Sequence, residues 1–104
     1  MSPSKKGKNQ AKQLTREKFT TNSGLVREVI IWSLPKSEGY PEGIKYRLIL
    51  VNATTGKVLV LFDNHPPKGH HKHLEEIETD YSFTTLTRLI EDFLKQCEKW
   101  ETKK

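Results

Sequence analysis

All four histidines of the chain lie in one short segment, residues 63–74, which reads DNHPPKGHHKHL. An unperturbed imidazole titrates at about pH 6.5, so these side chains can release or accept a proton near neutrality. Neutral ring nitrogens can equally coordinate a transition metal. This concentration of proton-transfer and metal-binding groups predicts that any chemistry of the protein takes place in this segment.

Acid–base cleavage of RNA is one reaction that the segment suits. The reaction needs one group to remove the proton of the 2′-hydroxyl and another to protonate the leaving 5′-oxygen, and two imidazoles can play these parts. If residues 70–73 are extended, His71 and His73 project from one side and His70 from the other. We therefore expect His71 and His73 to form the acid–base pair. The candidate catalytic set is His70, His71, His73 and Asp63, with Asp63 as the carboxylate that orients an imidazole.

Basic side chains around the segment are the candidate substrate contacts. Cleavage builds negative charge on the oxygens bound to phosphorus, and cations stabilise that charge. We expect Arg47, Lys68 and Lys72 to hold the phosphate. His65, at the start of the segment, is expected to contact the substrate as well.

Metal binding and a purely structural role are the alternatives. The H-x-H pair at residues 71–73 and a nearby carboxylate can hold Zn²⁺, and His65 or His70 can complete a tetrahedral set. The stronger signatures, H-E-x-x-H and paired C-x-x-C, are absent from the sequence. Asp63 and Asn64 also favour turns by bonding their own backbone, which explains Asn64 without a role in chemistry. The prediction is a site that needs no cofactor, with zinc as the alternative.

Composition narrows the class of protein. The 104 residues suit one domain with a modest core, and the net charge of +5 comes mostly from four lysines in the first 13 residues. The rest of the chain has 14 basic and 13 acidic side chains, so it is not generally basic. No apolar run approaches the roughly 20 residues that span a bilayer, and no secretory signal is recognisable. The single cysteine, Cys97, excludes an internal disulfide and fits a reducing cytoplasm.

The elements that position the segment follow from hydrophobic patterns. Residues 1–13 are polar and Lys-rich, which is typical of a disordered tail, and residues 14–104 are expected to form a single domain. A helical period of apolar residues from Leu86 to Trp100 predicts an amphipathic C-terminal helix. The expected fold is α+β, a four-stranded antiparallel meander packed by that helix. The predicted strands, rich in β-branched and aromatic residues, are 14–20, 25–34, 44–51 and 57–62.

Several short motifs along the chain resemble one known family. They are REVIIWSLP at 27–35, KYRL at 45–48, FDNH at 62–65, GHHKH at 69–73 and YSF at 81–83, with Asp92-Phe93 further on. Together, over residues 14–98, they are similar to the TumE family of toxins from prokaryotic toxin–antitoxin modules. The resemblance implies a small cytoplasmic toxin made beside a DNA-binding, winged-helix-like antitoxin. It leaves the reaction open.

Two functional hypotheses therefore stand side by side. In the first, the protein is a toxin that acts on RNA, with the His segment as acid and base and no metal. In the second, it is a non-catalytic module that binds nucleic acid or protein, and the His segment holds a metal or structures the surface. Turnover of RNA in the absence of metal distinguishes the two, because a binding module shows none.

Overall fold

The computed structural model describes residues 11–101. Most of the predicted disordered tail, residues 1–10, lies outside the described residues, whereas Lys12 and Gln13 pair with the second strand and belong to the sheet. The folded part therefore begins before residue 14, where the tail was predicted to end. The elements are β1 (Lys12–Thr20), β2 (Leu25–Ser33), β3 (Ile44–Asn52), β4 (Val58–Asp63), β5 (His71–Leu74), β6 (Ile77–Asp80) and α2 (Leu86–Glu101).

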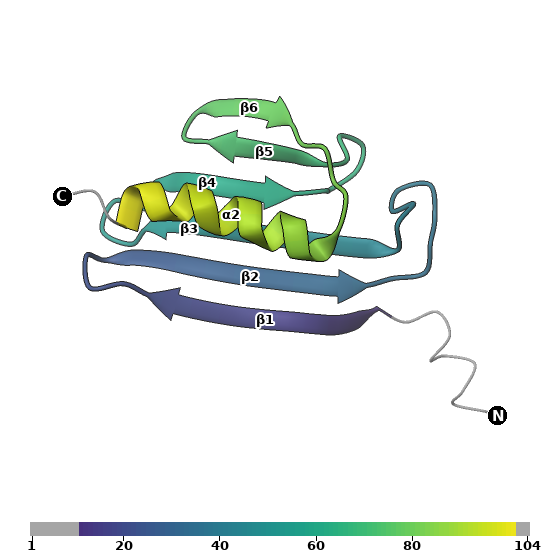
Figure 1. Cartoon of the computed structure of the whole chain (residues 1–104), viewed down its shortest axis with the longest axis horizontal. Helices are drawn as coiled ribbons and strands as arrows, with labels where there is room; N and C mark the ends of the chain where they lie inside the picture. The colour runs from purple at the N-terminus through teal and green to yellow at the C-terminus, as the bar shows by residue number, and fades with distance from the viewer. Residues whose placement is uncertain (1–10, 102–104) are drawn as a thin grey trace.

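The strands form one antiparallel sheet in the order of the sequence, from β1 to β6 (Figure 1). This arrangement confirms the predicted antiparallel meander and the α+β class. The predicted number of four strands is wrong, because residues 71–80 form a further hairpin of two short strands beyond β4. The His segment is therefore not one continuous loop, since its last four residues, His71–Leu74, are β5.

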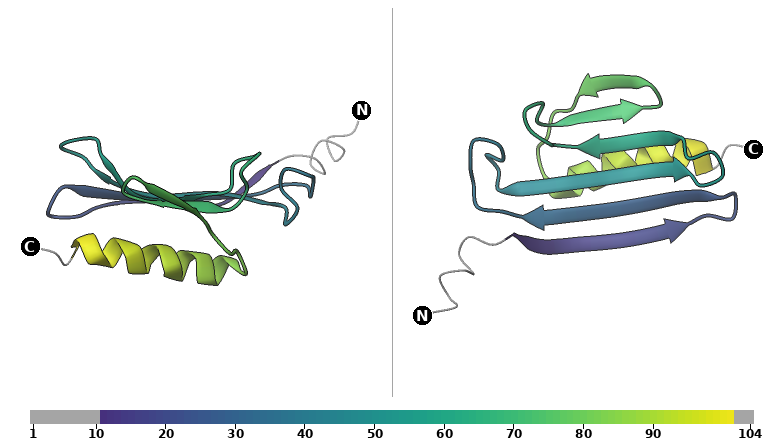
Figure 2. Two further views of the ribbon diagram at one scale, coloured as in Figure 1. Left: turned by 90° about the horizontal axis from the view of Figure 1, so that it is seen from above. Right: turned by 180° about the vertical axis from the view of Figure 1, so that it is seen from behind.

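Helix α2 crosses one face of the sheet, as the view from above in Figure 2 shows. Leu89, Phe93 and Cys97 recur at four-residue steps and are fully buried, which confirms the amphipathic helix. The helix begins at a capping residue, since the hydroxyl of Thr85 accepts a hydrogen bond of 3.1 Å from the amide of Arg88. Burial raises the pKa of the Cys97 thiol to about 12, so the side chain stays neutral. No helix in the described part of the chain is long and apolar enough to cross a membrane.

The hydrophobic core lies between α2 and the central strands. Tyr46, Leu48 and Leu50 of β3 and Val60 and Phe62 of β4 are almost inaccessible to solvent. They occupy alternate positions because successive side chains of a strand point to opposite faces of the sheet. The strands are thus fixed in register by the residues that the helix covers, and a slip by one residue would expose all of them.

The second face of the sheet, opposite α2, has no described element packed on it (Figure 2). We call it the open face. The register places Arg47 of β3 beside Asp63 of β4, and Asp63 beside His71 of β5. His73 lies two residues further along β5 and shares this face with them. The sheet therefore brings Arg47, Asp63, His71 and His73, from three strands, together on the side that the helix leaves free.

Candidate functional site

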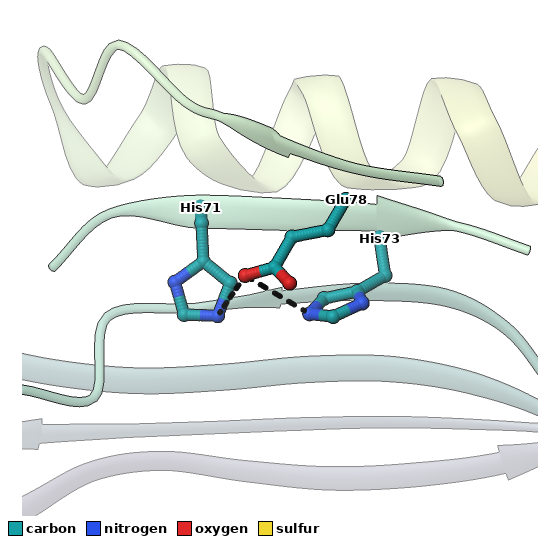
Figure 3. Close-up of side chains that lie close together, drawn as sticks. All are labelled: His71, His73 and Glu78. Carbon is teal, nitrogen blue, oxygen red and sulfur yellow. Dashed lines mark ion pairs between the residues drawn. The ribbon is translucent and has the colours of Figure 1, made fainter. Parts of the chain in front are cut away.

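His71, His73 and Glu78 form the centre of the site on the open face. His73 pairs with Glu78 across the β5–β6 hairpin, and His71 is the next residue of β5 on that side. In Figure 3 the two rings flank the carboxylate of Glu78. The ring centroids lie 5.3 Å apart, and each Nε2 is 3.7 Å from Oε2 of Glu78. The structure thus brings together the two predicted acid–base residues, and it adds a carboxylate that was not expected.

The ring of His71 is held in one orientation. Its Nδ1 lies 2.7 Å from the carbonyl oxygen of Gly69, and a carbonyl can only accept, so Nδ1 carries a proton and donates it. The residue is only 6% exposed, which makes this bond hard for water to replace. In the neutral ring, the lone pair is then on Nε2. His71 therefore presents Nε2 to the open face, either as a base or as a ligand.

Asp63 lies against the same nitrogen. Its Oδ1 is 2.8 Å from Nε2 of His71, and the role of this carboxylate in orienting the imidazole stays a prediction. This oxygen is inaccessible to solvent and has no hydrogen-bond partner among the described residues, because its contact with the ring is not aligned as a hydrogen bond. We regard the pair as an ion pair that forms when the ring is protonated. A buried carboxylate oxygen is thus left with capacity to bind a proton or a cation.

Glu78 is tied to a lysine on the loop between β4 and β5. Nζ of Lys68 lies 3.0 and 2.8 Å from the two carboxylate oxygens. This hydrogen bond lowers the pKa of Glu78 below its ordinary value. The sequence alone does not single out Glu78, since nothing in a single sequence pairs it with His73. The signal that could have found it is the hairpin register of β5 and β6.

His70, a member of the predicted catalytic set, lies on the other side of the sheet. Its ring stacks on Phe83 with centroids 4.8 Å apart, Nδ1 is 2.9 Å from the hydroxyl of Tyr46, and Nε2 is 3.1 Å from Glu42. Burial raises the pKa of Tyr46, so its hydroxyl stays protonated and can donate to Nδ1. Both nitrogens of His70 are thus engaged, Nδ1 with Tyr46 of β3 and Nε2 with Glu42 of the 34–43 loop. The structure does not bring this residue to the His71–His73 pair.

The structure also separates the four predicted substrate contacts, as it separates His70 from the His71–His73 pair. Arg47 is exposed on the open face beside Asp63. Lys68 and His65 line a hollow of about 310 Å³, whose walls also include Asp63 and His71. Lys72 pairs with Phe62 of the core and lies on the face that carries the helix. The site therefore includes three of the four residues, and Lys72 stands apart from it.

Asn64 has a structural role that differs from the expected one. Instead of bonding its own backbone, its Oδ1 accepts a hydrogen bond of 3.0 Å from the amide of Tyr46, and its Nδ2 donates one of 2.7 Å to the carbonyl of Ile44. Both partners belong to β3, at the point where β4 has already ended. The side chain thus replaces the main chain of a longer β4 and fixes where the connection to the His segment leaves the sheet.

The arrangement has the donor types of a transition-metal site as well as those of an acid–base pair. One ligand atom from each of His71, His73 and Glu78 lies within 4.8 Å of the others. Imidazole nitrogen and carboxylate oxygen are both common zinc ligands. The same side chains can therefore move protons when free or hold a cation.

The fold and the site define a small α+β protein with a histidine–carboxylate cluster on an uncovered sheet face. A family model described as toxin TumE matches residues 5–101. The chain belongs to this family, and the match begins within the lysine-rich segment that the motifs left out. Comparison with curated proteins and with solved structures gives no match. Membership makes the protein a toxin by family, and an antitoxin is its expected counterpart.

Proposed function

We propose that the protein is the toxin of a toxin–antitoxin module and that it arrests growth by cleaving RNA at the His71–His73 site. The observation that supports the proposal is that two imidazoles lie side by side on the open face, with one ring bonded to the carbonyl oxygen of Gly69 and in contact with Asp63. The family supplies the role of toxin. The protein would act in the cytoplasm beside a DNA-binding, winged-helix-like antitoxin that neutralises it.

The proposed reaction is internal transfer at phosphorus. One imidazole takes the proton of a 2′-hydroxyl, the 2′-oxygen forms a bond to phosphorus, and the bond from phosphorus to the 5′-oxygen breaks. The other histidine, as imidazolium, gives its proton to that leaving oxygen. The products are a 2′,3′-cyclic phosphate and a free 5′-hydroxyl. Arg47, paired with Asp63, and Lys68, on the wall of the hollow beside His71, are the candidate cations that stabilise the charge on the phosphorane.

The first test is growth of a bacterial host after induction of the protein. We expect the wild type to arrest growth and His71→Ala/His73→Ala, made at equal soluble level, to lose the arrest. Lys72→Gln is the matched control, because Lys72 lies on the same strand but on the opposite face. If the double variant arrests growth as the wild type does, the toxic surface lies elsewhere and the assignment falls.

A second measurement tests the reaction itself. Purified protein is incubated with single-stranded RNA in the presence of EDTA, and the ends of the products are analysed. We expect 2′,3′-cyclic phosphate ends, and no cleavage where a 2′-deoxynucleotide replaces the nucleotide that attacks. Binding of RNA without cleavage would contradict the proposal and would favour a non-catalytic toxin that grips its target.

A further inference from the structure

His71 and His73, the proposed acid and base, also form a candidate metal-binding site together with Glu78. We propose that a divalent transition metal of the zinc type binds to Nε2 of His71, Nε2 of His73 and the carboxylate of Glu78, and that it blocks the proposed RNA cleavage. The binding is independent of any reaction. The inhibition rests on the proposed function, because it concerns the regulation of that site.

Distances within the cluster favour a metal over direct bonds. Each Nε2 lies 3.7 Å from Oε2 of Glu78, which is too long for a hydrogen bond. In a tetrahedral zinc site, with bonds of about 2.0–2.1 Å, neighbouring ligand atoms lie about 3.3 Å apart. All three ligand atoms fall within 4.8 Å of one another. Small movements of side chains on two adjacent strands would therefore bring them around one ion.

The surroundings of His71 match those of a metal ligand. Its Nδ1–H is bonded to the carbonyl oxygen of Gly69 at 2.7 Å, and histidines that bind metals usually donate their second N–H in this way. The bond fixes the tautomer that presents a lone pair at Nε2. His71 and His73 are alternate residues of one strand, with ring centroids 5.3 Å apart, so the strand places both imidazoles on the same side.

Asp63 supplies a second, independent indication. Its Oδ1 is shielded from solvent, lacks a hydrogen-bond partner among the described residues, and lies 2.8 Å from the ligating nitrogen of His71. Leaving such an oxygen unsatisfied is unfavourable, and a nearby cation satisfies it. The ligand atoms that lie within 4.8 Å of one another come from His71, His73 and Glu78, and Asp63 stands beside His71 as a second carboxylate whose negative charge favours a divalent ion at the site.

Metal binding and acid–base catalysis exclude each other at this site. An imidazole that coordinates through Nε2 has no lone pair left there to accept a proton and no proton there to donate. An ion shared by His71 and His73 would remove both the acid and the base in one step. Metal occupancy is therefore expected to suppress RNA cleavage.

Lys68 opposes the metal, because its ammonium group holds both oxygens of Glu78. A cation entering the site must compete with this charge. We expect Lys68→Gln to bind Zn²⁺ about tenfold more tightly, since it removes the repulsion and frees Glu78. Lys72→Gln, on the opposite face of the same region, should bind as the wild type does.

The test is titration of the full chain, stripped of metal with a chelator, first with ZnCl₂ by calorimetry and then with CoCl₂ by visible absorption. We expect one site per chain and the absorption of four-coordinate cobalt. His71→Ala/His73→Ala should lose the site. Glu78→Gln should weaken binding at least about tenfold while keeping the circular dichroism of the wild type, which guards against an unfolded variant.

Other results would overturn the inference. The inference is wrong if the wild type does not bind Zn²⁺. If binding survives both in His71→Ala/His73→Ala and in Glu78→Gln, the metal is bound by other histidines. The RNA assay separates this inference from the proposed function. If zinc binds and no RNA is cleaved with or without metal, the cleavage proposal fails and the metal site stands. If RNA is cleaved in EDTA but zinc at a filled site leaves the rate unchanged, the inhibition is wrong.

Discussion

At the scale of single residues, Asn64 decides where the His segment starts. Strand β4 ends at Asp63, yet the antiparallel strand β3 extends further at this end of the sheet. Its first residues, from Ile44, therefore need partners for their backbone polar groups. The amide of Asn64, only 3% exposed, provides both a donor and an acceptor in the same plane. Without it, these backbone groups would be buried unpaired. One side chain thus lets the chain leave the sheet directly after a residue of the site.

We expect Asn64→Ala to lower the free energy of unfolding by about 2–4 kcal/mol, because it leaves two backbone groups without partners. The measurement is urea denaturation followed by circular dichroism. Asn52→Ala is the matched control, since Asn52 also bonds two backbone groups but in an exposed turn where water can replace it. It should cost less than about 1 kcal/mol. Equal losses for the two variants would contradict this role for Asn64.

At the scale of elements, the β5–β6 hairpin carries the site and is closed by an unfavourable turn. Leu74 and Ile77 pair across it, so Glu75 and Glu76 make the connection. Glu75 has a φ of 59°, in the left-handed region that costs a residue with a side chain about 1–2 kcal/mol. The turn therefore stores strain next to the strand that holds His73.

Replacing the strained residue should stabilise the hairpin. We expect Glu75→Gly to raise the free energy of unfolding by about 0.5–1 kcal/mol, after subtraction of the greater freedom of glycine in the unfolded chain. The exposed ion pair of Glu75 with Lys57, 3.6 Å long, contributes little. Glu76→Gly, without a positive φ to relieve, should destabilise by a similar amount. Thermal denaturation of the two variants tests this prediction. Equal shifts of the two midpoint temperatures would contradict it.

This turn also explains what the sequence could and could not predict. Strands β2, β3 and β4 and helix α2 have long apolar patterns, and turns such as Asn22-Ser23-Gly24 have the residues that their geometry prefers. The β5–β6 hairpin has neither signal. Glu-Glu is not one of the residue pairs that favour a two-residue hairpin turn, and the two strands are only four residues long. Alternation along β5 still predicted that His71 and His73 share a face. Their meeting with Glu78 depends on a pairing between strands that a single sequence does not reveal.

At the scale of the whole molecule, one helix covers one face of a six-stranded sheet and leaves the site on the other. The register puts Arg16 of β1 and Lys45 and Arg47 of β3 on this open face, along with Trp32 of β2. No described residue forms an ion pair with Lys45 or Arg47. Although basic and acidic residues nearly balance after residue 13, the fold thus places cations that can bind phosphate on the same face as the histidines.

The position of these cations on the open face leads to a prediction about RNA affinity. Because Arg47 lies on the face of the site, Arg47→Gln should weaken binding of single-stranded RNA and reduce the slope of log affinity against log salt by about one, the loss of one phosphate contact. Arg88→Gln, which removes another exposed arginine from α2 on the opposite side of the sheet, should leave both quantities unchanged. Fluorescence anisotropy with labelled RNA at several salt concentrations measures them. An equal effect of the two substitutions would mean that net charge alone, rather than the open face, attracts the RNA, because the substitutions change the total charge by the same amount and remove it from opposite faces of the sheet.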